Sequence, residues 1–313
     1  MKIIALLPFK NEAWSLPSYL STVTKVADEI IALNDSSTDA GPQLLRESGV
    51  TVLDFASNAE KVVDMSARRQ TLLDAGRKAG GTHFIWLDAD ETFSADFISH
   101  ARDTIALLTP GQKLTMRWVN AWKDTTHYLD DKKSPFGYIW KDFVVCDTPD
   151  ASFSNQFLSE ARTEGQHDTP LVLAEEKGVV LHWQFARWDV TEYKQARYRC
   201  HELIEGTRSA RRINNTYSIT LDSTSLSTKV LPELWVHTIT LPDTETNDVN
   251  WYVVDIQKLF QTYSIEFFEP LQIWHIKDLH QLFLKKTGRE PKVAMFPKWL
   301  IYLNKIKNKI LHA

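Results

Sequence analysis

Four apolar segments in the N-terminal part of the chain are each followed directly by polar side chains that could bind a ligand. Asn, Asp and Ser are also ordinary turn and helix-cap residues, so a single run of them means little. Four runs on consecutive segments indicate a shared site instead. The runs are Lys10–Glu12, Asn34–Asp39, Ser57–Asn58 and Asp88–Glu91.

The fourth run, Asp88-Ala89-Asp90, places two carboxylates at the end of an apolar segment. Hard divalent ions such as Mg²⁺ and Mn²⁺ take one or two protein carboxylates and complete their coordination with water and substrate phosphate oxygens. The pair therefore suits a complex of metal and diphosphate. The alternative, a helix cap followed by a solvated acid, stays open.

The apolar segments have the composition of buried strands, and helix-length stretches separate them. Strands that alternate with helices predict a mostly parallel sheet with helices on both faces, and ligands of such sheets bind at the carboxyl ends of the strands. The expected strands are 3–7, 29–33, 50–55 and 83–87, then 113–119 and 179–183; the expected helices are 16–27, 41–48, 64–79, 94–108 and 190–212. Long loops and short strands are expected over 120–179, a polar linker over 214–228, and mainly helix after it.

Length and composition set the class of protein. A chain of 313 residues predicts about two domains, which we place at 1–190 and 191–313. The net charge of -4 argues against a nucleic-acid partner. The two cysteines, Cys146 and Cys200, form no disulfide framework or zinc motif, and neither a signal peptide nor a membrane-spanning segment is expected. These features predict a cytoplasmic protein.

The chain has neither the glycine pattern of dinucleotide-binding folds nor a P-loop, so a metal would have to hold any phosphate. Four motifs, in this order, resemble those of glycosyltransferase family 2: LLPFKNE, IIALNDSSTDAG, SARRQTLLDAG and FIWLDADE. The resemblance covers roughly residues 1–190. It implies the GT-A fold, which is a Rossmann-like, mostly parallel α/β sheet flanked by helices, here with a mainly helical C-terminal extension.

The resemblance also implies roles for residues that match the family's motifs. The nucleotide-sugar donor, for which a UDP-sugar is favoured, would contact Pro8, Asn11, Glu12, Asp35, Arg68 and Asp88, and Mn²⁺ or Mg²⁺ would be held by Asp88, Asp90 and His182. The sequence departs from the family's pattern at Asn34, Ser36 and Arg69.

His182, which directly follows the apolar run Val179-Val180-Leu181, resembles the third metal ligand of many GT-A enzymes. A histidine beside an apolar run is also often a buried structural residue, and this alternative stays open. An inverting transfer needs a carboxylate base for the acceptor hydroxyl. The candidates are Glu160, which stands roughly where related enzymes carry a Glu before an Arg, and Asp142.

The chain ends in a basic amphipathic segment, 296–312, with Trp299, Leu303, Ile306 and Ile310 on one helical face. Such a helix could contact anionic lipid on the inner face of the membrane and bring the enzyme to a lipid-linked acceptor. The alternative is a terminal helix packed on the protein's own surface.

Together these features predict a metal-dependent glycosyltransferase that moves a sugar with inversion to a glycan or lipid-linked saccharide, as in polysaccharide or lipopolysaccharide biosynthesis. Two alternatives remain. The WLDADET motif also fits a haloacid dehalogenase-like phosphatase with Asp88 as nucleophile, although that motif normally follows the first strand. An inactive glycan-binding relative would explain the changes at Asn34 and Ser36.

Overall fold

The chain divides into two units, each with a hydrophobic core of its own. The computed structural model describes residues 1–55, 65–134, 136–153, 162, 169–221, 226–245 and 250–295. The first unit comprises Met1–Trp188 and Leu226–Thr246, and the second comprises Asp189–Ser225 and Asn247–Ala313. Residues 226–246, predicted to belong to the C-terminal extension, belong to the first unit instead. Side chains such as that of Trp235 are buried in the core of this unit.

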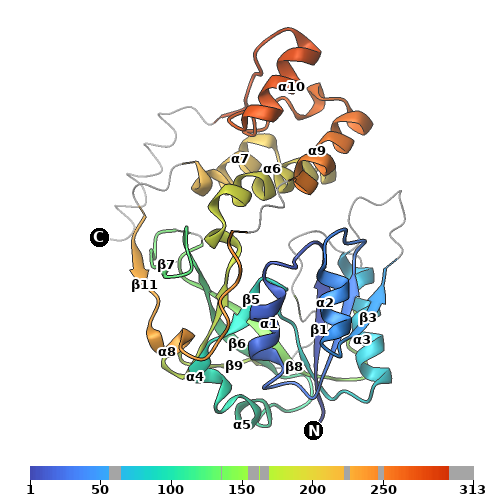
Figure 1. Cartoon of the computed structure of the whole chain (residues 1–313), viewed down its shortest axis with the longest axis vertical. Coiled ribbons are helices and arrows are strands. Elements are labelled where there is room, and N and C mark those ends of the chain that lie inside the picture. Colours follow the sequence, from blue (N-terminus) through green and yellow to red (C-terminus); the bar gives the residue numbers. More distant parts are fainter. Residues whose placement is uncertain are drawn as a thin grey trace. The chain divides into compact units, whose positions relative to one another are not determined.

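A large sheet forms the centre of the first unit (Figure 1). In the described part of the chain its strands follow the order β3-β2-β1-β4-β8-β6-β10-β5, with β9 beside β6. The strands are β1 (Ile3–Phe9), β2 (Glu29–Asn34), β3 (Thr51–Asp54), β4 (His83–Ile85), β5 (Glu91–Phe93), β6 (Lys113–Asn120), β8 (Ile139–Cys146), β9 (Leu171–Val172) and β10 (Val179–His182).

Strands β3, β2, β1 and β4 run parallel to one another, β8 is antiparallel to β4 and β6, and β10 is parallel to β6. The carboxyl ends of β2, β1 and β4 therefore meet at one edge. The predicted α/β fold class, a mostly parallel sheet flanked by helices, is confirmed.

Helices cover both faces of this sheet, which explains why β1 is apolar along its whole length. Leu16 and Tyr19 of α1 (Leu16–Val23) and Leu45 of α2 (Gly41–Glu47) pack with Ala5 and its neighbours on one face. On the other face, α3 (Met65–Lys78) packs with the alternate residues of β1. The helix predicted at 94–108 is two short helices, α4 (Ala95–Ile98) and α5 (Ala101–Ile105). A separate two-stranded sheet joins β7 (His127–Leu129) to β11 (Thr228–Val230), and α8 (Glu233–Val236) follows.

A bulge in β8 sets which of its side chains face the site. Leu114 of β6 pairs with Val144, but the next residue, Thr115, pairs with Asp142, so that Phe143 is the extra residue. A bulge of this kind interrupts the alternation of side chains along a strand. Lys141, opposite Met116, consequently lies on the face that carries Phe143 and Val144, and Asp142 lies on the opposite face.

The second unit is helical, as predicted. Its helices are α6 (Trp188–Glu205), α7 (Ala210–Thr216), α9 (Asn250–Tyr263) and α10 (Lys277–Thr287). The helix predicted over 190–212 is interrupted, since Gly206 adopts a left-handed φ of 69° after α6. The basic segment 296–312 lies outside the described residues. Within the described part of the chain, no helix has both the length and the apolar character required to cross a membrane.

Candidate active site

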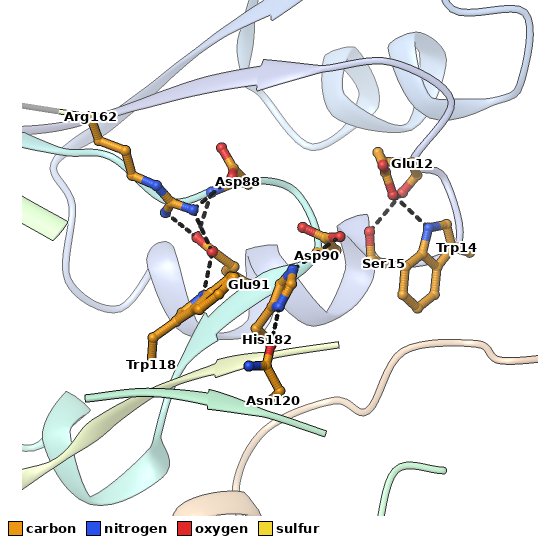
Figure 2. A network of polar contacts seen from close by, with 10 residues as sticks. All are labelled: Glu12, Trp14, Ser15, Asp88, Asp90, Glu91, Trp118, Asn120, Arg162 and His182. Atoms are coloured by element: carbon orange, nitrogen blue, oxygen red, sulfur yellow. Dashed lines mark hydrogen bonds and ion pairs between the residues drawn. The ribbon is translucent and has the colours of Figure 1, made fainter. Parts of the chain in front are cut away.

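Three acidic residues gather where the chain leaves β4 (Figure 2). The main chain turns here, with the N–H of Glu91 donating to the carbonyl of Asp88 at 3.0 Å, and Glu91 then begins β5. The side chain of Asp88 is 42% exposed, while those of Asp90 and Glu91 are 6% and 0% exposed. The turn thus presents one carboxylate to solvent and buries two behind it.

Glu91 is the anchor of this turn. One of its carboxylate oxygens accepts from the indole N–H of Trp118 at 2.7 Å and from Nη2 of Arg162 at 2.6 Å. The other accepts from the main-chain N–H of Asp88 at 2.9 Å and from Nη1 of Arg162. The Glu91 side chain is itself 0% exposed and accepts all four bonds, so it positions the neighbours that donate them.

Arg162 links the acidic residues, and Figure 2 shows its guanidinium pointing at both Asp88 and Glu91. Its Nη2 lies 2.7 Å from Oδ2 of Asp88. Burial alone would lower the pKa of Arg162, but the charges of Asp88 and Glu91 outweigh it and raise that pKa. The guanidinium is therefore a fixed positive charge in the site.

His182 lies beside Asp90, as the sequence analysis required. Its Nε2 is 3.6 Å from Oδ2 of Asp90, and its Nδ1 is 2.6 Å from Oδ1 of Asn120. The pairing of β10 with β5 and β6 brings these residues together, since His182 is opposite both Glu91 and Asn120. The imidazole also stacks on Trp118, with ring centroids 4.2 Å apart.

Lys141 adds a second positive charge. Its Nζ lies 3.3 Å from the centroid of the Trp118 ring. Burial lowers the pKa of Lys141 to about 8; Arg162 adds to this effect, and the carboxylates of the site oppose it. Lys141 was not among the predicted site residues.

The donor set fits a divalent cation that substrate helps to hold. Asp90 and His182 offer an oxygen and a nitrogen 3.6 Å apart, and both are ligand types that Mn²⁺ accepts. Among the residues that the structure describes, the buried hydroxyl of Tyr19 has no hydrogen-bond partner, and burial together with Asp88 and Glu91 raises its pKa. Among the described residues no group of three His, Cys, Asp or Glu side chains could hold a metal by itself. Asp88, which pairs with Arg162, is not drawn into a three-ligand cluster with Asp90 and His182.

A second polar group lies at the ends of β2 and β1. Nη2 of Arg68 is 2.9 Å from Oδ1 of Asp35, and Nζ of Lys10 is 3.7 Å from its other oxygen. The Arg68 guanidinium also lies over the ring of Phe55, 5.4 Å from the centroid. The structure thus joins Asp35 and Arg68, which the sequence analysis assigned to the donor nucleotide.

Asn11 mainly organises the loop that follows β2. Its side-chain oxygen accepts from the N–H of Thr38 at 2.6 Å and from that of Asp39 at 3.3 Å. Ser36 in the same loop has a φ of 57°, a region that favours glycine, which the family's pattern carries at this position. Asn11 therefore organises the loop of the predicted pocket, and its direct contact with a nucleoside stays a prediction.

The other two predicted nucleoside contacts have local partners. Oε2 of Glu12 accepts from the indole N–H of Trp14 at 2.6 Å (Figure 2). Pro8 lies within β1, opposite Leu33 of β2. Their contact with a nucleotide stays a prediction.

The two candidate bases have different outcomes. Asp142 accepts from the hydroxyl of Thr115 and lies 3.6 Å from Nζ of Lys113, on the face of β8 opposite Lys141. Its prediction as the base is corrected for this reason, since the bulge at Phe143 turns it away from the acidic residues. Glu160 lies outside the described residues.

Comparison with known proteins gives remote likenesses. No family model and no curated protein matches the sequence. Among solved structures, S. aureus TarS 1-349 is similar over 91% of this chain and 87% of its own length, at 12% identity and a TM-score of 0.40. Glucosyl-3-phosphoglycerate synthase from Mycobacterium tuberculosis, in complex with Mn²⁺, UDP-glucose and phosphoglyceric acid, is similar over 29% of this chain and 34% of its own, at 23% identity and a TM-score of 0.23. Likenesses at this level identify no substrate.

Proposed function

We propose that the chain is a metal-dependent glycosyltransferase of family 2 that uses a nucleotide-diphosphate sugar, with a UDP-sugar as the favoured donor. The observation that carries the proposal is the close approach of Asp90 and His182, 3.6 Å apart, within an acidic turn at the end of β4. Asp35, which pairs with Arg68 of α3, follows β2, and β2 is separated from β4 by β1 alone. The same edge of the sheet would therefore bind the nucleotide beside Asp35 and the diphosphate beside the acidic turn.

In this proposal the nucleotide binds near Asp35 and Arg68, and the diphosphate binds near the acidic turn. Asp90 and His182 would hold Mn²⁺ or Mg²⁺ together with the donor's phosphate oxygens. The ion would neutralise the negative charge that develops on the departing diphosphate. Asp88 would take part after exchanging some of its contact with Arg162.

Charge within the site supports an anionic ligand. Asp88, Asp90 and Glu91 carry three negative charges, and Arg162 and Lys141 carry two positive ones. A divalent cation would change this sum from about -1 to about +1, which favours the binding of a diphosphate. Lys141 would then donate to a phosphate oxygen of the leaving group.

The acceptor would enter from the side opposite the diphosphate, with a carboxylate taking the proton of its hydroxyl as the hydroxyl attacks the anomeric carbon. Glu160 stays our candidate for that base, and inversion is the stereochemical outcome that such a direct displacement gives. A glycan or lipid-linked saccharide as acceptor, and contact of 296–312 with the membrane, rest on the sequence alone.

The proposal is tested by thermal unfolding of the purified chain with a panel of UDP-, GDP- and dTDP-sugars, each with and without Mn²⁺. A ligand that binds the native state raises the unfolding temperature. We expect one nucleotide class to do so in a metal-dependent manner, and Asp90→Asn to abolish the metal-dependent part. If none of the nucleotide sugars raises the unfolding temperature, the proposal is refuted.

A second assay addresses the phosphatase alternative. Release of phosphate from simple phosphomonoesters, lost in Asp88→Asn, would favour a haloacid dehalogenase-like enzyme. We expect no such release, because Asp88 is paired with Arg162 and its motif follows the fourth strand in the sequence.

A further inference from the structure

The amide of Asn120 has only one orientation that satisfies its surroundings. Asn120 is fully buried, and its Nδ2 lies 2.6 Å from the main-chain carbonyl of Phe136. A carbonyl oxygen can only accept a hydrogen bond, so the amide nitrogen must face it. The amide oxygen of Asn120 consequently faces Nδ1 of His182 at 2.6 Å.

This orientation assigns the proton of His182. An amide oxygen has no hydrogen to donate, so Nδ1 of His182 must carry the hydrogen of the shared bond. In the neutral imidazole the other nitrogen, Nε2, then carries a lone pair.

The lone pair faces a carboxylate. Nε2 lies 3.6 Å from Oδ2 of Asp90, and both side chains are 6% exposed. Two acceptors directed at one another in a buried place repel, unless a cation lies between them. The stacking of His182 on Trp118, whose N–H is bound by Glu91, keeps the ring in this direction.

We propose that Asn120 is a positioning residue that sets the tautomer and direction of His182, so that Nε2 and Asp90 bind a divalent cation together. The inference deepens the proposed function, in which this cation meets the donor's diphosphate. Outer partners that fix a ligating histidine commonly change metal affinity by about 10- to 100-fold when they are removed.

The first experiment measures the tautomer directly. The imidazole nitrogens of ¹⁵N-histidine-labelled protein are recorded by long-range ¹H–¹⁵N correlation at about pH 8, where ordinary histidines are neutral. The signal of His182 is assigned by its loss in His182→Gln. We expect a proton on Nδ1 in the unaltered chain, retained in Asn120→Asp, which keeps an acceptor, and replaced by a tautomer mixture in Asn120→Leu. A proton on Nε2 in the unaltered chain would overturn the inference, without any variant being needed.

The second experiment measures binding of Mn²⁺ alone, by electron paramagnetic resonance of the free ion. Asn120→Leu should weaken binding about 10- to 100-fold, and Asn120→Asp should weaken it less. Asn214→Leu is the matched control, because Asn214 is also a buried asparagine that donates to main-chain carbonyls, but in the second unit. It should leave both the affinity and the His182 signal unchanged.

The outcomes separate this inference from the proposed function. Equal Mn²⁺ affinity in Asn120→Leu and the unaltered chain would refute the role of Asn120 even if nucleotide sugars bind. Mn²⁺ binding that depends on Asn120, in a protein that binds no nucleotide sugar, would uphold the role of Asn120 and refute the proposed function.

Discussion

Replacement of Glu91 by glutamine tests whether this buried carboxylate holds the site together. Glu91 accepts four hydrogen bonds, two from Arg162 and one each from Trp118 and the main chain of Asp88. The amide oxygen of glutamine can accept two of them. The amide nitrogen would face the other two donors, and the Arg162 cation would keep only Asp88 as its counter-charge.

The magnitude follows from these contacts. Each buried donor left without an acceptor costs about 1–3 kcal/mol, and breaking a buried ion pair costs about 3–5 kcal/mol. We therefore expect Glu91→Gln to lower the free energy of unfolding by about 3–5 kcal/mol. Glu29→Gln is the matched control: Glu29 pairs with Lys2 at 2.9 Å on the surface, where loss of a pair costs about 0–1 kcal/mol.

The assay is urea unfolding of the single variants Glu91→Gln and Arg162→Met and of the double variant. The double variant removes both members of the Glu91–Arg162 ion pair. Its loss of unfolding free energy should therefore be smaller than the sum of the two single losses by about 2 kcal/mol. Single losses that add to within about 0.5 kcal/mol would refute the coupling between Glu91 and Arg162.

Three further perturbations have expected results. Lys141→Met should be more stable than the unaltered chain by about 1–3 kcal/mol at pH 7, because a lysine whose pKa in the folded state is about 8 destabilises the fold while it is protonated. The difference in unfolding free energy should vanish as the pH rises from 8 towards 10.5, and a difference that does not change with pH would contradict this cause. Asp255→Asn should lower the free energy of unfolding by about 1–3 kcal/mol at neutral pH, because burial raises the pKa of Asp255 but hydrogen bonds and charge from His201 and Arg197 outweigh it and lower that pKa. In acid unfolding, the difference in stability between the two proteins should shrink below about pH 4, and a difference that persists there would refute this cause. Gly178→Ala should lower the stability measured by thermal unfolding by about 2 kcal/mol more than Gly49→Ala, because a Cβ at Gly178 would lie 2.4 Å from the Cβ of Phe97, whereas a Cβ at Gly49 meets no described atom within 4 Å. Equal losses of stability would show that the positive φ alone determines the cost.

The parallel part of the sheet and the polar edge could be predicted because both leave local signals. Apolar runs of strand length, each followed by polar residues, specify β1 to β4 and the edge where they end. His182 could be placed with Asp90 only through the family resemblance, because no local pattern reports that β10 lies next to β5.

Residues that depend on distant pairing could not be predicted in this way. Arg162 reaches Asp88 across 74 positions of sequence, and the role of Glu91 depends on that contact. Asp142 was a reasonable candidate base, but the bulge at Phe143 exchanges it with Lys141 on the site's face. Asn34, which replaces an aspartate of the family's pattern, still accepts from the N–H of Ser37 at 2.8 Å, so the loop tolerates the change.

Because residues 226–246 belong to the first unit, the first unit is not a continuous stretch of the chain, and this determines how it can be produced separately. A fragment that stops at residue 190 would lack β11 and the side chains of Leu231, Trp235 and Ile239, which are buried in the core of the first unit. Excising the helical insertion Asp189–Ser225 and bridging its ends, with the chain stopped after Thr246, would keep that unit whole. The first unit should therefore be produced as an internal deletion and not as a simple truncation.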